Sequence, residues 1–382
     1  MSMDFGLSEQ HKMFKKAVRD FAGKEVAPLV AEAEKNETCP KEVFEKMGKL
    51  GYLCPGYPPE YEGGGLGEIG TCIMLEELAR VSPGIAAGIS VQSGLSTYPL
   101  LTHGTKGQKQ KFLIPAIKGE KIGAYALTEP NAGSDSGAIE TTAKRDGDCY
   151  IVNGNKIYIT NGQICDFVIV AVYTNKSKGT RGISTIIIES GTPGFSAMKM
   201  AKLGYHSAAT AELAFEDCRV PAENLIGEEG RGFKYMMEAL NVARISHAAR
   251  SVGIATAAFE ASLSYAKERA QFGQPIGRFQ AIAFKLSTLA TQLEAARSFL
   301  YQIASLYDQG NECRKEGPMV KVFCSELAIR AAEEAMRIHA GAGYLAESVV
   351  QRYFRDAILS HTTEGTTEIQ QLVIARELGL SG

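Results

Sequence analysis

The sequence predicts an α+β fold, with helices at both ends of the chain and strands between them. Residues 8 to about 50 have helical periodicity, with Phe14, Val18 and Phe21 on one face, and helical texture returns from about 69 to 117. Between about 121 and 225, short β-branched and aromatic runs are separated by Asn-Gly, Lys-Gly and Pro-Gly turns, as in antiparallel hairpins. From about 229 onward the pattern is again that of long helices. Segregated helices and strands indicate α+β.

These changes of texture divide the 382 residues into three predicted domains. They are an N-terminal α-helical domain (1–120), a middle antiparallel β-domain (121–225) and a C-terminal helical bundle of four-helix type (226–382).

Three helices are predicted within the last segment besides the long one that opens it. They cover about 278–308, 317–340 and 367–378, with "FGQP" and "AGAG" as breaks. Thr367 and Gln370 match a capping box, which predicts that the final helix starts at 368 and ends before Gly379.

Composition excludes several classes of function. Hydrophobic residues make up 45% and charged residues 22%, and the formal net charge is −2, so neither a nucleic-acid surface nor a polybasic membrane surface is predicted. No run approaches the ~18 apolar residues of a membrane span, and no apolar signal core opens the chain. Eight scattered cysteines without a C-x-x-C pair, and dispersed histidines, indicate buried thiols in a reducing cytosol and no metal site. We therefore expect a cytoplasmic protein of bacterial type.

Two loops have a composition that suggests ligand binding, and one of them is kept as a candidate. The glycines of "GGLGEIG" (64–70) match G-x-G-x-x-G, but a proline-rich loop precedes them instead of a buried strand, so a dinucleotide site is rejected. The run "YALTEPNAGSDSG" (125–137) is small and turn-forming, so its backbone N–H groups and hydroxyls could approach an anionic or ring-polar ligand. The alternative is a turn capped by its own Asn, Asp and Ser side chains.

Two further stretches carry polar groups beside a helix end. In "KERAQFGQPIGRFQ" (267–280), Arg269 either complements a helix dipole or, with Gln271, Phe272 and Gln280, forms a phosphate clamp with an aromatic wall. In "LSHTTEGTTEIQ" (359–370), Glu364 lies in the loop before the last helix. It is either a solvated loop residue or a catalytic base, whose pKa flanking apolar residues would raise by desolvation.

These motifs, in this order and with "FEDCRVP" between them, closely resemble the acyl-CoA dehydrogenase family over essentially the whole chain. "LTEPNAGSD" and "EGTTEIQ" carry the resemblance most specifically. It implies FAD as cofactor, a homotetramer and a three-domain fold of helices, β-domain and helices.

The resemblance also implies positions for FAD contacts. The positions are Tyr125, Leu127, Thr128, Gly133 and Ser134 in the first loop; Tyr158, Ile159 and Thr160 along the flavin ring; Arg269, Gln271, Phe272 and Gln280 reaching the FAD of a neighbouring subunit; and Arg337, Gly341, Thr366 and Glu368. Relatives more often have Trp at 158 and Gln at 337.

Glu364 matches the catalytic base of the family. The implied reaction is removal of the thioester α-proton by Glu364 while the β-hydride passes to flavin N5, which yields a 2-enoyl-CoA. Some branches place the base on the long helix, but that position is Ala243 here. By the same resemblance, the acyl-CoA is held by residues Ser134, Asn241, Arg244, Thr363 and Gly365.

Two departures from the family pattern concern the substrate. Thr362 and Thr363 replace the usual Ile-Tyr before the base, which predicts a short, branched or cyclic acyl group. "ISVQSG" (89–94) resembles the glutaryl-CoA dehydrogenase branch, but Ala86 stands where that branch has a carboxylate-binding arginine. We therefore expect an uncharged acyl tail and no decarboxylation.

The sequence is compatible with more than one function. An acyl-CoA dehydrogenase that passes electrons to an electron-transfer flavoprotein is the leading interpretation. An oxygen-using oxidase, an enoyl-CoA reductase of the same fold, and a non-catalytic protein that binds flavin or acyl-CoA are the alternatives. The direction of the reaction, the pathway and the exact acyl group are not encoded in any motif.

Overall fold

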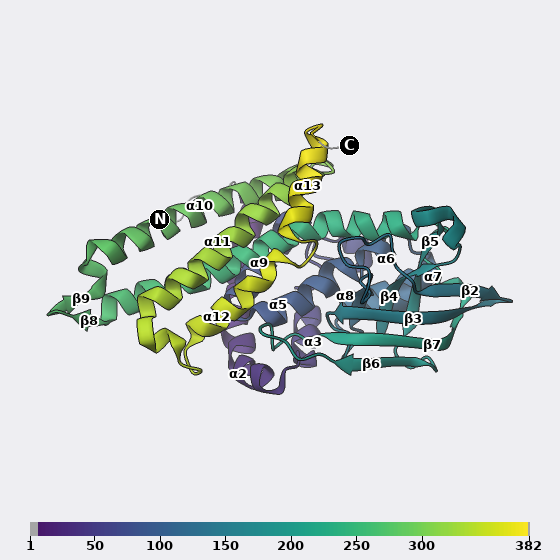
Figure 1. The fold of residues 1–382 in the computed structure, drawn as a ribbon, viewed down its shortest axis with the longest axis horizontal. Coiled ribbons are helices and arrows are strands. Elements are labelled where there is room, and N and C mark those ends of the chain that lie inside the picture. The colour runs from purple at the N-terminus through teal and green to yellow at the C-terminus, as the bar shows by residue number, and fades with distance from the viewer. Residues whose placement is uncertain (1–6, 381–382) are drawn as a thin grey trace.

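The computed structural model describes residues 7–380 and has the predicted α+β architecture (Figure 1). Helices make up the first and last parts of the described range, and one seven-stranded sheet lies between them in sequence. In Figure 1 the sheet occupies one end of the elongated molecule and the C-terminal helices extend to the other.

The N-terminal part consists of short and medium helices. They are α1 (Glu9–Phe21), α2 (Ala27–Asn36), α3 (Lys41–Lys49), α4 (Gly67–Val81), α5 (Pro83–Ser90), α6 (Tyr98–His103), α7 (Lys106–Gln108) and α8 (Ile114–Ile117). π-helical turns continue three of them: η1 (Ala22–Val26), η3 (Val91–Leu95) and η4 (Lys109–Leu113). A 3₁₀ turn, η2 (Pro59–Tyr61), lies in the proline-rich loop.

The literal glycine motif in that loop has a packing role. Gly67 opens α4 at φ +63°, and a Cβ there would lie 2.4 Å from a carboxylate oxygen of Asp308. That carboxylate accepts hydrogen bonds from the backbone N–H groups of Glu68 (2.6 Å) and Ile69 (3.2 Å), so it caps the helix start. The glycine permits this approach, and no strand lies between residue 7 and the glycine.

The strands form one sheet in the order β1-β4-β2-β3-β7-β6, with β5 paired to β4. Their bounds are β1 (Gly123–Ala126), β2 (Thr142–Asp146), β3 (Cys149–Ile159), β4 (Phe167–Tyr173), β5 (Ile183–Glu189), β6 (Phe195–Lys199) and β7 (Ala211–Pro221). Two 3₁₀ turns accompany them, η5 (Lys176–Gly182) and η6 (Ala222–Asn224). The sheet is mainly antiparallel as predicted, but β1 pairs with β4 in parallel, and β2 touches β4 in the same sense.

Burial explains why β4 reads as one apolar run. Its alternate residues pack into two separate clusters, Phe167 and Ile169 into one and Val168 and Val170 into the other. Successive side chains of a strand point to opposite faces, so both faces of this strand are covered. A strand buried on both sides has no reason to alternate apolar with polar residues.

The C-terminal part is built around α9 (Gly232–Glu268), a 37-residue helix that passes through the helical core. The remaining elements are the hairpin β8 (Ala270–Gln271) and β9 (Gln274–Pro275), η7 (Ile276–Arg278), α10 (Gln280–Asp308), α11 (Glu316–His339), η8 (Ala340–Tyr344), α12 (Val349–Ile358), η9 (Leu359–His361) and α13 (Thr367–Glu377). Small residues let α9 approach its neighbours closely: a Cβ on Gly253 would lie 2.4 Å from the carbonyl oxygen of Glu76 on α4.

The start of the last helix differs by one residue from the prediction. Thr366, not Thr367, is the N-cap, and its hydroxyl accepts from the backbone N–H of Ile369 at 3.3 Å. The helix therefore begins at Thr367. Its end agrees with the prediction, because it stops at Glu377 before Gly379, which has φ +75°.

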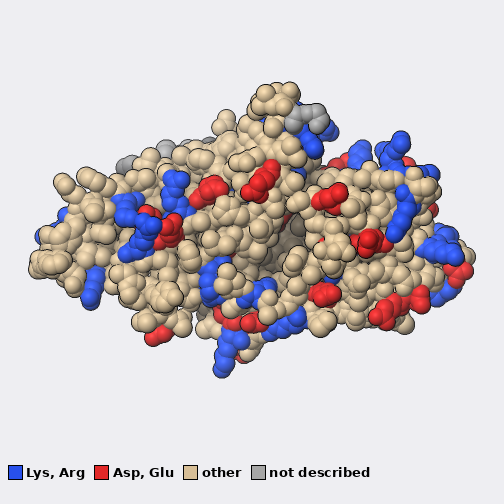
Figure 2. Space-filling view, viewed as in Figure 1, with Lys and Arg blue, Asp and Glu red and all other residues tan. Residues whose placement is uncertain are grey.

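The surface carries acidic and basic side chains over much of the face in Figure 2, which is hollowed near its centre where helices meet strands. All eight cysteines are free thiols; seven are buried, and Cys149 is half-buried. Within residues 7–380 no helix combines the length and apolar character needed to cross a membrane.

Candidate active site

Glu364 lies in the turn between α12 and α13, with its side chain packed against α9. The side chain is only 9% exposed, so it is not the solvated loop residue of the alternative interpretation. Its backbone has φ +52°, and Gly365 follows at φ +97°. A left-handed glutamate is uncommon and costs conformational energy. The turn is held by Gln370, whose amide nitrogen donates to the carbonyl oxygens of Glu364 (2.9 Å) and Gly365 (3.2 Å).

Two side chains from α9 contact the Glu364 carboxylate. Arg250 Nη2 donates to Oε1 at 2.5 Å, and His247 Nδ1 lies 2.8 Å from Oε2. The two α9 residues are three apart, so they lie on one face of the helix. Both are almost fully buried.

The charge on Arg250 decides the protonation state of this carboxyl group. Burial alone would raise the pKa of Glu364, but the adjacent guanidinium and imidazole hold it well below its usual range. The predicted increase by desolvation is therefore wrong, because flanking Leu359 and Leu372 are each more than a third exposed and the real neighbour is a buried cation. Glu364 is ionised throughout the neutral pH range.

His247 is neutral at the same site. Burial lowers its pKa to about 4. Nδ1 lies 2.8 Å from Glu364 Oε2, a hydrogen-bond distance, whereas Nε2 has no partner within residues 7–380. The proton of the neutral ring is therefore assigned to Nδ1, which donates to Oε2. A carboxylate oxygen that accepts one hydrogen bond keeps a further lone pair, so Oε2 can still receive a proton.

A second cation and one hydroxyl group complete the surroundings of the turn. Lys321 on α11 donates to the carbonyl oxygen of Gly365 at 3.0 Å, and burial lowers its pKa to about 8. Thr363 Oγ1 lies 3.2 Å from His247 Nδ1. Thr363 and Gly365 thus lie beside the candidate base, as the sequence predicts.

Arg244 also lies on α9, one to two turns before Arg250. It is 9% exposed, burial lowers its pKa, and its Nη1 donates to Asn241 Oδ1 at 2.7 Å. Its Nε is a buried donor without a hydrogen-bond partner in the described part of the chain. A donor in that state suits a polar ligand such as the one predicted for Asn241 and Arg244.

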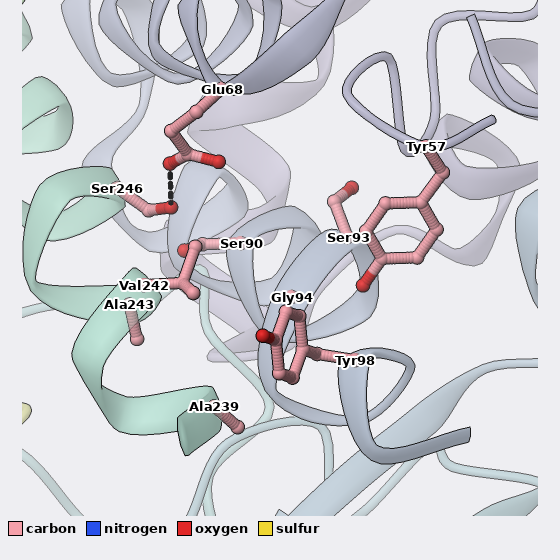
Figure 3. A pocket seen from close by; sticks show the side chains of 10 residues that line it. All are labelled: Tyr57, Glu68, Ser90, Ser93, Gly94, Tyr98, Ala239, Val242, Ala243 and Ser246. Atoms are coloured by element: carbon pink, nitrogen blue, oxygen red, sulfur yellow. Dashed lines mark hydrogen bonds between the residues drawn. The ribbon is translucent and has the colours of Figure 1, made fainter. Parts of the chain in front are cut away.

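A cavity opens beside the same stretch of α9 (Figure 3). It is lined by Tyr57, Glu68, Ser90, Ser93, Gly94, Tyr98, Ala239, Val242, Ala243 and Ser246. Ala243, His247 and Arg250 follow one another at helical spacing along one stripe of α9. Because four residues of helix rise about 6 Å, the cavity wall and the contacts of Glu364 are about one turn apart.

The first two predicted flavin stretches meet at one end of the sheet. The backbone N–H of Ile157 donates to Thr128 O at 3.0 Å, and Lys156 Nζ donates to Leu127 O at the same distance. Tyr125 is half-buried in β1 and donates to Met236 O. These contacts place the Tyr125–Thr128 segment against the end of β3.

The residues of β3 that are predicted to face the flavin lie at an irregularity of the strand. The pairing of β3 with β7 shifts register between Lys156 and Ile159, and Tyr158 there has φ +61° and is 65% exposed. Ile159 is buried and Thr160 half-buried. Gly133 and Ser134 lie exposed in the neighbouring loop. An exposed aromatic ring on a strand end beside a polar loop fits a planar, ring-polar cofactor such as FAD.

The remaining predicted cofactor contacts lie elsewhere. Arg269, Gln271 and Phe272 belong to the β8–β9 hairpin, which Figure 1 shows at the opposite end of the molecule from the sheet. All are exposed, Phe272 by 93%, and so is Gln280 at the start of α10. One chain therefore cannot bring this group to the flavin stretch of its own sheet.

The last four predicted positions are distributed between two helix ends. Arg337 is exposed near the end of α11, where it pairs with Glu333, and Gly341 follows it in η8. Thr366 and Glu368 lie at the start of α13, Thr366 as the N-cap.

Sequence reasoning did not single out His247, Arg250, Lys321 or Glu68. A usable signal was present for the first two: they interrupt an apolar, small-residue run, "ISHAARSVGIATAA", in a helix that had to be buried. Polar groups in such a helix require partners, and a carboxylate elsewhere in the chain is the natural one.

Three family models match the chain end to end. They are described as acyl-CoA dehydrogenase, N-terminal domain (residues 8–120), middle domain (124–218) and C-terminal domain (230–379).

Individual proteins are similar over nearly the full length. The chain is 41% identical to a short-chain specific acyl-CoA dehydrogenase of Clostridium acetobutylicum, over 98% of this chain and 100% of that one. It is 41% identical to an acryloyl-CoA reductase (NADH) of Anaerotignum propionicum, over 98% and 96%. A chain solved in work on the electron transferring flavoprotein of Acidaminococcus fermentans superposes with a TM-score of 0.96 at 42% identity, over 98% and 99%.

Proposed function

This chain belongs to the acyl-CoA dehydrogenase family, and we propose from that premise that it oxidises a short acyl-CoA thioester to the 2-enoyl-CoA with Glu364 as the base. It is an oxidoreductase whose cofactor is FAD. The observation that supports the role of Glu364 most strongly is that its carboxylate is buried and ionised, with one oxygen bound to Arg250 and the other 2.8 Å from His247 Nδ1.

Different residues of the chain bind the substrate and remove its proton. Arg244 and Asn241 orient the polar part of the thioester from α9, and Ser134 does so from the exposed loop. The Glu364 carboxylate removes the α-proton, while Arg250 and His247 hold its two oxygens in place from α9. FAD, when bound, supplies the acceptor for the β-hydride.

Arg250 has two opposed effects on this step. It keeps the carboxylate ionised and fixed, which favours a base that is ready at any neutral pH. It also lowers the proton affinity of Glu364, which weakens the base. The hydrogen bond from neutral His247 acts in the same direction as Arg250, because donation to the carboxylate also favours its ionised form.

The proposed substrate is a short, branched or cyclic acyl group with an uncharged tail. Thr363 in place of a larger residue leaves room beside Glu364, and Ala86 supplies no cation for a tail carboxylate. A relative named as short-chain specific supports the chain length.

The test is anaerobic bleaching of the yellow protein by a panel of straight, branched and ring thioesters. We expect fast bleaching by members with few carbons. A clear optimum at octanoyl-CoA or longer contradicts the proposed substrate, and no bleaching by any thioester contradicts catalysis.

We also propose an electron-transfer flavoprotein as acceptor and a homotetramer as the assembly. The similarity to a chain from work on such a flavoprotein supports the first. The exposed hairpin with Phe272, distant from its own sheet, supports the second, because a neighbouring subunit could bring it to a flavin. A cytoplasmic location and the domain boundaries at 120 and 225 stay predictions.

Enoyl-CoA reduction is a second candidate, favoured by one observation. A carboxyl group with a depressed pKa is a strong acid once protonated, so Glu364 is suited to deliver a proton to the α-carbon. Rapid reoxidation of the chemically reduced flavin by an enoyl-CoA, with slow reduction by the saturated thioester at every pH, distinguishes this direction.

A further inference from the structure

The cavity beside α9 has an unusual lining for a site that receives only hydrocarbon. Its α9 wall has the apolar residues Ala239, Val242 and Ala243 and one hydroxyl group, from Ser246. The other walls carry four hydroxyl groups and one carboxyl group, from Tyr57, Ser90, Ser93, Tyr98 and Glu68 (Figure 3). Ligand pockets that bind apolar chains are lined mainly by apolar side chains, with few polar groups placed for orientation.

Glu68 is the polar group that most needs an explanation. It is 7% exposed, and its Oε1 accepts from Ser246 Oγ at 2.9 Å across the cavity wall (Figure 3). No cationic side chain pairs with it in the described part of the chain, and the nearby carboxylate of Asp308 adds negative potential. Burial raises the pKa of Glu68 to about 8, so at neutral pH it is mainly a neutral acid that can both donate and accept.

The hydroxyl groups differ in whether they already have a hydrogen-bond partner in the protein. Tyr57 is bonded to Thr97 at 2.9 Å, and Ser93 Oγ accepts from the backbone N–H of Cys54 at 3.3 Å. The side chain of Ser90 is 8% exposed and makes no hydrogen bond within residues 7–380. Ser90 therefore offers a hydroxyl on the α5 side of the cavity, and Glu68 offers a carboxyl on the α4 side.

From this arrangement we infer that the cavity binds the distal end of the acyl group and that this end carries an uncharged hydrogen-bonding oxygen, a hydroxyl or a ketone, held by Glu68 and Ser90. The inference rests on the proposed function and narrows its substrate class. The cavity is one helical turn from the contacts of Glu364, so one short acyl group can reach both.

The charge of the lining selects among polar tails. A carboxylate tail would meet Glu68 and the field of Asp308 with no cation to pair with, so it is disfavoured. An ammonium tail would have to leave water for a buried site, which costs several kcal/mol before any attraction to Glu68. An uncharged oxygen carries neither penalty. A methyl group in its place would leave buried polar groups without partners, which is the strongest basis for rejecting a substrate analogue.

The test uses thioester pairs in which only the last heavy atom differs. They are pentanoyl-CoA with 4-hydroxybutanoyl-CoA and hexanoyl-CoA with 5-hydroxypentanoyl-CoA, and kcat/KM is measured by flavin reduction in the holoenzyme. We expect the hydroxyl member of at least one pair to be favoured by about tenfold or more. Glu68→Leu removes that preference, whereas Glu68→Gln retains it because an amide also donates and accepts.

Two further variants separate recognition from folding. Ser90→Ala is expected to reduce the preference even if Glu68→Leu is recovered without flavin. Thr256→Val removes a buried α9 hydroxyl bonded to Val252 O, outside the cavity, and is expected to leave the ratio unchanged.

Three results overturn the inference. One is a wild-type protein that is rapidly reduced but prefers the alkyl member of both pairs, in which case the proposed dehydrogenase function stands. Another is a preference for 5-aminopentanoyl-CoA or glutaryl-CoA over the hydroxyl thioester, which assigns a charged tail. A protein that no thioester reduces contradicts the proposed function itself.

Discussion

Replacing Arg250 by glutamine should move the pH dependence of flavin reduction. The guanidinium at 2.5 Å is the main reason that the pKa of Glu364 lies below its usual range, and burial acts in the opposite direction. Breaking a buried ion pair costs on the order of 3–5 kcal/mol. One pKa unit corresponds to about 1.36 kcal/mol, so we expect the pKa of Glu364 to rise by roughly 2–4 units, which at the upper end exceeds the ordinary glutamate value of about 4.3.

The sign of the effect follows from the role of the base. Only the ionised carboxylate accepts a proton, so kcat/KM falls as the pH drops through the pKa of Glu364. The wild-type protein should show no such decline between about pH 5 and 8, because its pKa is lower than this window. The Arg250→Gln variant should lose activity toward the acid end of the window.

Stopped-flow reduction of the flavin by a short thioester, measured at each pH, provides the profile. Arg250→Lys is the matched control: it keeps the charge, so its profile should stay close to that of the wild type. Superimposable profiles for the wild type and Arg250→Gln refute the reasoning, because Arg250 would then have no influence on the group that accepts the proton.

Three further predictions concern other parts of the fold. Because the pKa of Glu68 is raised in the folded protein, the folded protein holds a proton that the unfolded chain releases. The contribution of this proton to stability is fully present below the pKa of the unfolded chain, near 4.5, and is lost as the pH rises toward about 8. In urea unfolding, the free energy of unfolding of Glu68→Gln relative to that of the wild type should therefore rise by on the order of 2 kcal/mol between about pH 6 and 8. A difference that stays constant over this range contradicts the prediction. Gly67→Ala should destabilise by roughly 1–3 kcal/mol because its Cβ would collide with the Asp308 carboxylate, whereas Gly23→Ala, with nothing within 4 Å, should not. Phe272→Ala should leave the monomer fold intact but weaken flavin retention or assembly, read as absorbance at the flavin band across a gel-filtration profile; unchanged retention and size contradict the neighbour-subunit contact.

The architecture was predictable because its signals are local. The texture of "CYIVNGNKIYITNG" indicates strand structure without knowledge of the rest of the chain, and β3 does span Cys149–Ile159. The expected turn at Asn153-Gly154 is wrong, because this pair lies inside β3 at a shift in its pairing with β7. The parallel pairing of β1 with β4 was not predictable, because it joins segments separated by more than forty residues and depends on how the helices cover the sheet.

The site was predictable only in part, for a related reason. Motifs place Glu364, but its surroundings come from α9, more than a hundred residues earlier, and nothing next to it in sequence announces Arg250. The pKa was therefore predicted with the wrong sign. The N-cap of the last helix could not be assigned from the sequence either. Thr366 and Thr367 are both threonines that could cap it, and only the backbone conformation shows that Thr366 does so.

Anaerobic flavin reduction in Glu364→Gln is the most direct test of the central claim, that one buried carboxylate removes the α-proton. Glutamine keeps the size of the side chain and a hydrogen-bond acceptor for Arg250, so the protein should remain folded and yellow. We expect reduction by a short thioester to slow by about 10²–10⁴-fold or more relative to the wild type. Reduction at the wild-type rate would show that the proton leaves by another route.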